Sequence, residues 1–258
     1  TLEAGTYIST GLLTAYGKNR GGNIKLTANG DIFTSSIRTF SAVANGGGKG
    51  GNISIVSTNG SINTTNNDSY GNNGTSLYTA GLNGNSGSVT LEAYDDIITN
   101  EIRTASDNNG NGGIVKLTSQ TGKIDTKGHR VYSYSNTGNA GRVVLNAYSG
   151  ITVGEINAYA FVKAGEVRLQ ANQDISTKLI FASSQSNDGN KISITSVYVG
   201  MVVGSLLMLV VILSRVISLL LQLRVMLVRS LLRLVVILKL GRSLLIHLMA
   251  LARVAILV

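Results

Sequence analysis

A unit first seen at Gly21 to Ile37, GGNIKLTANGDIFTSSI, recurs down the chain to about Ile192. Each copy begins with a small residue or a glycine pair, forms a short alternating segment, turns at a polar dipeptide and enters a second apolar segment. One apolar position is shared by the copies: Ile24, Ile53, Val89, Val115, Val143, Val167 and Ile192. Two residues later stand Leu26, Ile55, Leu91, Leu117, Leu145, Leu169 and Ile194. Self-similarity of this kind predicts a solenoid.

The spacing within a copy is nearly constant, whereas the spacing between copies varies. The second segment supplies Ile32, Ile62, Ile97, Ile124, Ile151 and Ile175, each eight or nine residues after the first apolar position. Copies begin 24 to 36 residues apart, so the variation lies in the Gly/Asn-rich connectors, which we expect to be loops. Leu2 and Ile8 repeat the internal spacing, so we expect an earlier copy at Thr1 and a longer parent chain carrying the export signal.

Alternation of period two in segments rich in Ile, Val, Thr and Tyr is a strand signal. Parallel stacking of each strand on its equivalent in the next copy would bury the apolar residues in columns. The prediction for residues 1–196 is therefore an all-β protein, a parallel β-helix of about seven to eight turns and roughly 35 to 40 Å in length. Asn29-Gly30 and Asn59-Gly60 are expected to supply left-handed turns, and pairs such as Gly21-Gly22 a sharp bend.

Composition agrees with a repetitive β protein, since the 258 residues include 31 Gly and no Pro, Trp or Cys. The absence of Cys excludes disulfides and thiolate metal sites. The net charge of +9 is unevenly divided. Before Val197 the chain has 15 Lys/Arg and 13 Asp/Glu, a balance of +2; the tail has 7 Lys/Arg and no acid. The body therefore lacks the basic patch expected of a protein that binds DNA or RNA.

The runs GGNIKLTANGDI (Gly21 to Ile32), GGNISIVSTNGSI (Gly50 to Ile62) and VTLEAYDDIITNEIRT (Val89 to Thr104) resemble the repeats of filamentous-haemagglutinin-type adhesins of two-partner secretion. The resemblance covers about Thr1 to Ser196. It implies a right-handed β-helix, secreted or displayed at the cell surface in association with the outer membrane. It also implies an outer-membrane translocator as a partner, and attachment to host or neighbouring cells or their glycans. The family's secretion domain carries Asn-Pro motifs, so a chain without Pro corresponds to the shaft.

The tail, residues 197–258, has a different composition, and three interpretations remain open. Ile192 to Ser214 is a 23-residue run without a charge, long enough to span a membrane. A basic amphipathic helix is the second interpretation, although the arginines do not keep to one helical face. The third is a tail with no evolved fold, non-native, disordered or helical.

That third interpretation is translation of the same repeat DNA in a shifted frame. Read one base late, codons for Gly-Gly-Asn-Ile give Val-Val-Ile-Leu, which occurs at Val210 to Leu213 and again at Val235 to Leu238. Gly-Asn-Gly-Gly likewise gives Gly-Met-Val-Val, found at Gly200 to Val203. A frameshift between about Ser196 and Gly200 would thus account for the loss of Asp and Gly and the gain of Val, Leu and Arg.

Candidate chemistry is sparse, and we predict no catalytic residue, no cofactor and no metal. Asp31, Asp96 and Asp174 hold equivalent places before the second-segment Ile, but Ser61, Lys123 and Gly150 interrupt them. Other candidates have commonplace explanations in turns, surface packing or composition. These are the cation ligands Asp95-Asp96, the histidines His129 and His247, the sequons Asn63-Thr64-Thr65 and Asn73-Gly74-Thr75, and sugar-stacking Tyr70, Tyr78, Tyr132, Tyr134 and Tyr159.

Two main functions follow from these observations. The first is a non-catalytic shaft segment of a large surface adhesin, which is not an enzyme. The alternative is a carbohydrate-active β-helix, a polysaccharide lyase or hydrolase that uses Asp96 or Asp174. A weaker alternative is a protein anchored in a membrane by residues 192–214.

Overall fold

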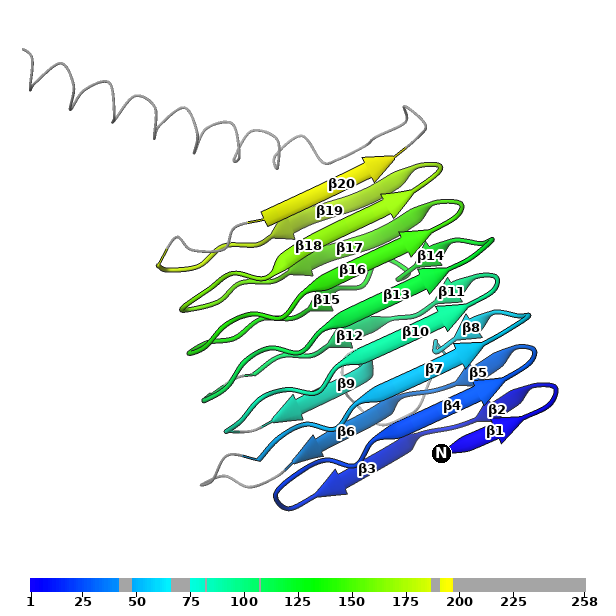
Figure 1. The fold of residues 1–258 in the computed structure, drawn as a ribbon, viewed down its shortest axis with the longest axis horizontal. Helices are drawn as coiled ribbons and strands as arrows, with labels where there is room; N and C mark the ends of the chain where they lie inside the picture. The colour runs from blue at the N-terminus through cyan, green and yellow to red at the C-terminus, as the bar shows by residue number, and fades with distance from the viewer. Residues whose placement is uncertain (42–47, 66–74, 82, 107, 187–190, 197–258) are drawn as a thin grey trace, which may run out of the picture. The chain divides into compact units, whose positions relative to one another are not determined.

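The computed structural model describes residues 1–41, 48–65, 75–81, 83–106, 108–186 and 191–196. They form a parallel β-solenoid of about seven turns, as the repeat predicts. In Figure 1 the strands of the front sheet run to the right, those behind run to the left, and the chain climbs from β1 to β20. The coil is therefore right-handed, as the family resemblance implies.

The first sheet contains one strand from every turn, and all its strands pair in parallel. Its eight strands are β1 (Leu2–Ala4), β4 (Ile24–Ala28), β7 (Ile53–Ser57), β10 (Val89–Ala93), β13 (Val115–Ser119), β16 (Val143–Ala147), β18 (Glu166–Ala171) and β20 (Lys191–Ser196). The register confirms the predicted columns, because Ile24 pairs with Ile53, Ile53 with Val89, and so on to Ile192.

The second sheet contains twelve strands and covers two parts of every turn. The predicted second strands are β2 (Ile8–Thr10), β5 (Ile32–Thr34), β8 (Ile62–Asn63), β11 (Ile97–Ile98), β14 (Ile124–Asp125), and the first halves of β17 (Ile151–Asn157) and β19 (Ile175–Phe181). Their isoleucines stack in one column from Ile8 to Ile175. The second predicted column is therefore also confirmed.

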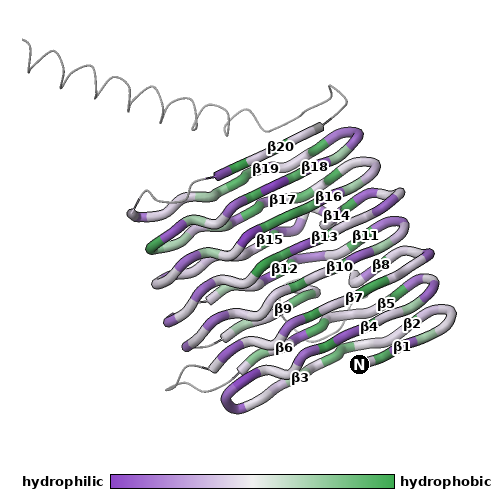
Figure 2. The backbone as a smooth tube through the Cα atoms, in the orientation of Figure 1, coloured by the Kyte–Doolittle hydropathy of each residue, from purple (hydrophilic) through white to green (hydrophobic). Residues whose placement is uncertain are grey.

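The expectation that everything between copies is loop is wrong, because each turn has a third strand. These strands are β3 (Leu13–Gly17), β6 (Ile37–Ser41), β9 (Thr75–Gly81), β12 (Glu101–Arg103), β15 (Val131–Tyr132), and the second halves of β17 and β19. They bury a third apolar column: Leu13, Ile37, Leu77, Ile102, Val131, Ile156 and Ile180. Figure 2 shows hydrophobic residues along the strands, where they alternate with hydrophilic ones.

The glycine pairs serve close packing of neighbouring turns more than bending of the chain. A Cβ on Gly51 would collide with the carbonyl oxygen of Gly22, and one on Gly87 with that of Gly51. The same holds for the next three turns, at Gly113, Gly141 and Gly165. Stacked main chains leave no room for a side chain at these five positions, so glycine is required there.

The Asn-Gly turns also differ from expectation, since they do not use left-handed backbone. Within the described ranges, positive φ occurs at Lys127, Gly110 and Gly128, and not at Asn29-Gly30 or Asn59-Gly60. Instead, Asn59 Nδ2 donates to Asn29 Oδ1 of the turn below (2.5 Å). Stacking of amide side chains, rather than left-handed conformation, explains Asn at these turns.

In three turns an interior threonine hydroxyl joins the third strand to the glycine corner that follows it in the chain. Thr39 Oγ1 donates to the Gly51 carbonyl (2.6 Å), Thr79 Oγ1 to Gly87 (2.7 Å) and Thr104 Oγ1 to Gly113 (2.9 Å). All three threonines have no exposed surface. The hydroxyl groups therefore satisfy carbonyl oxygens of the glycine corners, and Ser86 and Ser133 supply a second donor to those of Gly87 and Gly113.

The predicted boundary at residue 196 and the three interpretations of the tail concern residues 197–258, which lie outside the described residues. Ile192 to Ser196, the start of the proposed membrane span, belongs to β20 and pairs with β18. None of the described residues forms a helix long and apolar enough to cross a membrane.

Substitution of Leu117 by Ala should lower the free energy of unfolding by about 2–5 kcal/mol, because it empties part of a fully buried column. Leu2 belongs to the same column but is 44% exposed, so Leu2→Ala is the matched control and should cost far less. Urea denaturation followed by circular dichroism measures both. Equal effects would contradict the assigned columns.

Replacement of Thr39 by Val should cost about 1–3 kcal/mol, because the Gly51 carbonyl loses its hydroxyl partner. Thr118→Val is the control, since the Thr118 hydroxyl is buried with no hydrogen-bond partner among the described residues. That variant should be neutral or slightly stabilising. The same denaturation measurement tests the pair, and the reverse order of stability would refute the role given to the interior hydroxyls.

Candidate functional site

The three aspartates predicted to be equivalent do occupy one column of the solenoid. Each precedes a stacked isoleucine of the second strand, but Asp31 and Asp96 are two turns apart, and Asp96 and Asp174 three. At about 4.8 Å per turn, neighbouring acids are roughly 10 Å apart or more. The structure therefore does not bring two of these carboxylates together.

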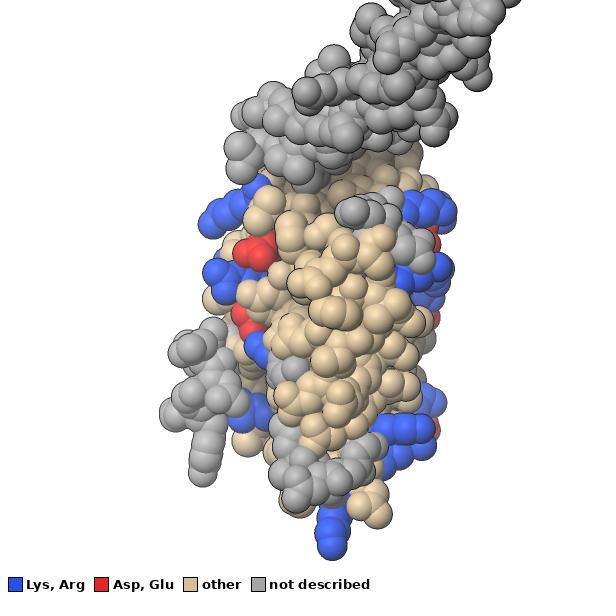
Figure 3. Space-filling model, turned by 90° about the vertical axis from the view of Figure 1, so that its left-hand side faces the viewer, with Lys and Arg blue, Asp and Glu red and all other residues tan. Residues whose placement is uncertain are grey.

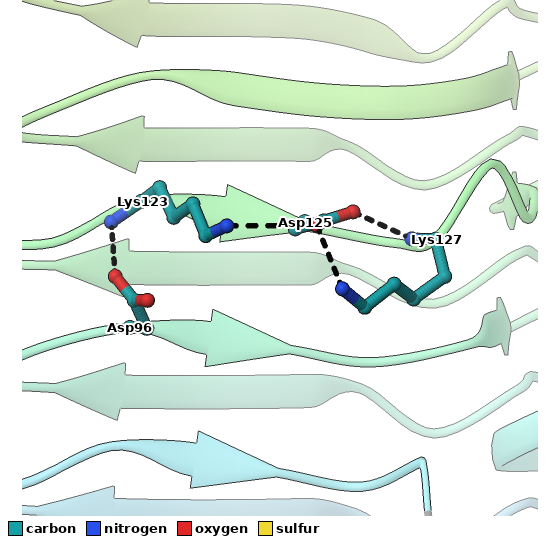
Figure 4. Close-up of polar contacts among 4 residues, drawn as sticks. All are labelled: Asp96, Lys123, Asp125 and Lys127. Carbon is teal, nitrogen blue, oxygen red and sulfur yellow. Dashed lines mark hydrogen bonds and ion pairs between the residues drawn. The ribbon is translucent and has the colours of Figure 1, made fainter.

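Two of these aspartates hold the main chain of the turn above. Asp31 Oδ1 accepts a hydrogen bond from Ser61 N (2.8 Å), and Asp96 Oδ1 accepts one from Lys123 N (2.9 Å; Figure 4). A Cβ on Gly60 or Gly122 would collide with the same oxygens. Because the glycine of the next turn has no side chain, the carboxylate fits in the space beside it. The role of these two aspartates is therefore structural.

Asp125 forms a charged cluster with Lys123 and Lys127 (Figure 4). Its carboxylate accepts from Lys127 N (2.7 Å) and lies 3.2 Å from Lys127 Nζ and 3.8 Å from Lys123 Nζ. Lys127 and Gly128 both have positive φ. The cluster closes a turn in which Ile124 and Val131 are seven residues apart, two more than in most turns. Lys123 and Lys127 both neutralise the Asp125 carboxylate. These residues therefore stabilise the turn.

The candidate metal ligands do not converge. His129 lies in the same turn, where its N–H donates to the Thr126 carbonyl (2.8 Å) and its own carbonyl accepts from Thr126 Oγ1 (2.8 Å). Within the described parts of the chain, no group of three or more His, Asp or Glu residues, including Asp95 and Asp96, can hold a metal ion. His247 lies outside the described residues.

The sequon at Asn63 forms part of the solenoid wall. Asn63 Oδ1 accepts from Thr65 N (2.9 Å) and Thr65 Oγ1 (2.7 Å), and Thr64 is buried and donates to Thr99 Oγ1 (2.8 Å). These residues are thus held in the wall by its own hydrogen bonds. Asn73 and Gly74 of the second sequon, and Tyr70, lie outside the described residues.

The tyrosines form contacts that the sequence does not reveal, on the outer face of the third strands. Tyr16 and Phe40 have ring centroids 5.3 Å apart, and Phe40 and Tyr78 6.3 Å. Higher in the stack, Tyr132 and Tyr134 meet edge to face at 5.9 Å, and Tyr159 stacks on Phe181 at 5.8 Å. Rings distant in sequence, such as Tyr16 and Phe40 or Tyr159 and Phe181, therefore meet because the strands of successive turns are neighbours.

Two arginines lie among these rings. Arg103 Cζ is 5.4 Å from the Tyr134 ring centroid and 6.0 Å from that of Tyr132, and its Nη2 donates to Tyr134 Oη (2.6 Å). Arg130 donates to Tyr132 Oη (2.8 Å) and forms an ion pair with Glu155 (3.4 Å). Cation–π contacts and hydrogen bonds hold the guanidinium groups against the rings.

Burial raises the pKa of Tyr132, while the hydrogen bond and positive charge of Arg130 act in the opposite direction. The folded protein therefore favours the neutral phenol. The hydrogen bond to Tyr132 raises the pKa of Arg130, so this guanidinium stays charged.

Comparison with known proteins gives no further assignment: no protein-family model, curated protein or solved structure matches this chain. The fold defines the class as a parallel β-solenoid built of β-helical repeats.

Tyr132 should ionise at a higher pH in the folded protein than in the unfolded chain, and Arg130→Ala should move that step higher still. Below the pKa of the unfolded chain, the contribution of Tyr132 to stability is complete, and it is lost as the pH rises towards the folded pKa. The difference in tyrosinate absorbance between the wild type and Tyr132→Phe isolates this step. A lower pKa in Arg130→Ala would contradict the assigned causes.

Proposed function

We propose that residues 1–196 form a non-catalytic shaft segment of a large secreted or surface-displayed adhesin of the filamentous-haemagglutinin type. One observation supports this proposal most: polar side chains at the turns bond to the main chain of the adjoining turn. Besides Asp31 and Asp96, Asn85 Oδ1 accepts from Asn111 N (3.0 Å), and Asn111 Oδ1 from Asn139 N (2.9 Å). Residues that could form a reactive site are used to join turns.

The edge on which the chain returns from the third strands to the first sheet supports the same role. Among the residues that Figure 3 colours, the middle of this edge shows no Lys, Arg, Asp or Glu, and charged residues lie on its two flanks. The stacked glycines lie in this part of each turn. Such a surface suits a passive, repetitive spacer whose length depends on the number of turns.

The remaining parts of the proposal follow from the family resemblance. The parent protein would leave the cell through an outer-membrane translocator and attach to host or neighbouring cells, with glycans among its targets. No enzymatic activity and no nucleic-acid partner are proposed. The net charge of +2 before Val197 agrees with the proposal that nucleic acid is not a partner.

The test is attachment of cells that display the full parent chain, together with its activity on acidic polysaccharides. Asp96→Asn and Asp174→Asn should leave attachment unchanged, because in Asp96→Asn the amide oxygen still accepts from Lys123 N. Leu117→Asp, which places a charge in a buried column, should destabilise the turns by several kcal/mol and reduce attachment.

Two outcomes would refute the shaft proposal. One is loss of attachment in a folded Asp96→Asn or Asp174→Asn variant. The other is turnover of an acidic polysaccharide that the same substitutions abolish, which would establish the carbohydrate-active alternative.

A further inference from the structure

Every turn of the solenoid contributes a planar π-group to the outer face of the third strands. We call this set the ring ladder, and from the first turn to the seventh it consists of Tyr16, Phe40, Tyr78, Arg103, the pair Tyr132 and Tyr134, Tyr159 and Phe181. Its contacts form three groups along the solenoid axis: Tyr16, Phe40 and Tyr78 at 5.3 and 6.3 Å, Arg103 with Tyr132 and Tyr134 at 6.0 and 5.4 Å, and Tyr159 with Phe181 at 5.8 Å. The rings of the first group are tilted against one another, and those of the last pair are stacked.

The ladder is open to solvent along its length. Tyr16 is 59% exposed and Phe181 43%, while the residues between them are half-buried. Part of each ring therefore remains accessible, and the tyrosines and Arg103 add hydrogen-bonding groups to the apolar rings. An accessible row of rings and donors is suited to a flat ligand that is both apolar and hydroxylated.

The repeat of the ladder selects for a polymer. One planar group recurs per turn, at about 4.8 Å. An extended peptide presents side chains on one face only every ~7 Å, so it falls out of step within a few residues. In a linear polysaccharide each unit is a single sugar ring, so the repeat distance of the polymer is about the length of one ring. Each ring has an apolar C–H face surrounded by hydroxyl groups. Its units can stay in step with successive turns.

Charge argues against a single-stranded nucleic acid, the other ligand that stacks on aromatic rings. Proteins of that kind combine the rings with a strongly positive groove. The outward-facing charged residues of the third strands and their flanks are Lys18, Arg38, Arg103, Arg130 and Lys178 against Glu101 and Glu155, a balance of +3 over seven turns. This is less than one charge per turn, so it does not match a polymer with a charge on every unit, whereas a ligand near neutrality needs no such match.

We propose that the ring ladder binds a linear, near-neutral polysaccharide lying along the solenoid axis. This site goes beyond the shaft role and does not depend on display at a cell surface. Because each turn adds one contact, affinity accumulates along the ladder instead of depending on a single residue.

Affinity electrophoresis of the full 258-residue chain through gels containing hydroxyethylcellulose, xylan or galactan tests the site directly. The wild type should be retarded by at least one of these neutral glycans. Tyr78→Ala combined with Tyr132→Ala should weaken the apparent affinity by about tenfold or more, because two central stacking contacts are lost.

The control is Tyr94→Ala combined with Tyr148→Ala. These tyrosines are 43% and 58% exposed at the corner between the first and second strands, away from the ladder, and their loss should leave retardation unchanged. Circular dichroism checks that each variant folds. If the first variant does not fold, Tyr16→Ala combined with Phe181→Ala removes the two most exposed rings and should also weaken binding.

Three results would overturn the proposal. The first is no retardation of the wild type in any of the three glycans. The second is equal affinity of the ladder and control variants. The third is binding of poly(dT) without binding of a neutral glycan, which would assign the ladder to single-stranded nucleic acid.

Discussion

Parallel, in-register stacking of the main chain is the constraint on which the rest of this structure depends. Each residue of a turn lies directly above its equivalent in the turn below. The residues at one position must therefore fit the same space in every turn. Where main chains approach most closely, only glycine fits, as at Gly51, Gly87 and Gly113. Where the interior is wide, Ile, Leu and Val fill three columns, and where a buried carbonyl needs a donor, Thr39 or Thr104 supplies it.

The same constraint assigns the polar residues of the turns to structure. An Asn or Asp at a turn lies one step below a main-chain N–H, so its side-chain oxygen finds a donor in the next turn. The outward-facing side chains of the strands are not subject to this requirement. Binding functions are therefore expected on the strand faces, and the ring ladder lies on one of them.

Variation in turn length is confined to places that do not disturb the columns. The turn closed by Asp125, Lys127 and Gly128 adds two residues between a second and a third strand, yet Val131 still stacks between Ile102 and Ile156. Extra loop residues cost little free energy compared with a break in a hydrogen-bonded column. The repeat can therefore drift in length while its register persists.

The sequence alone determined the first two columns, because their spacing of eight or nine residues recurs in every copy. The third strand also left a signal, since Ile32 and Ile37, like Ile97 and Ile102, are five residues apart. Longer connections in two turns, from Ile62 to Leu77 and from Ile124 to Val131, obscured it. The ring ladder has no such period in sequence, and only stacking brings its members together. Tertiary structure therefore decided the outer face, because contacts there form between turns and not along the chain.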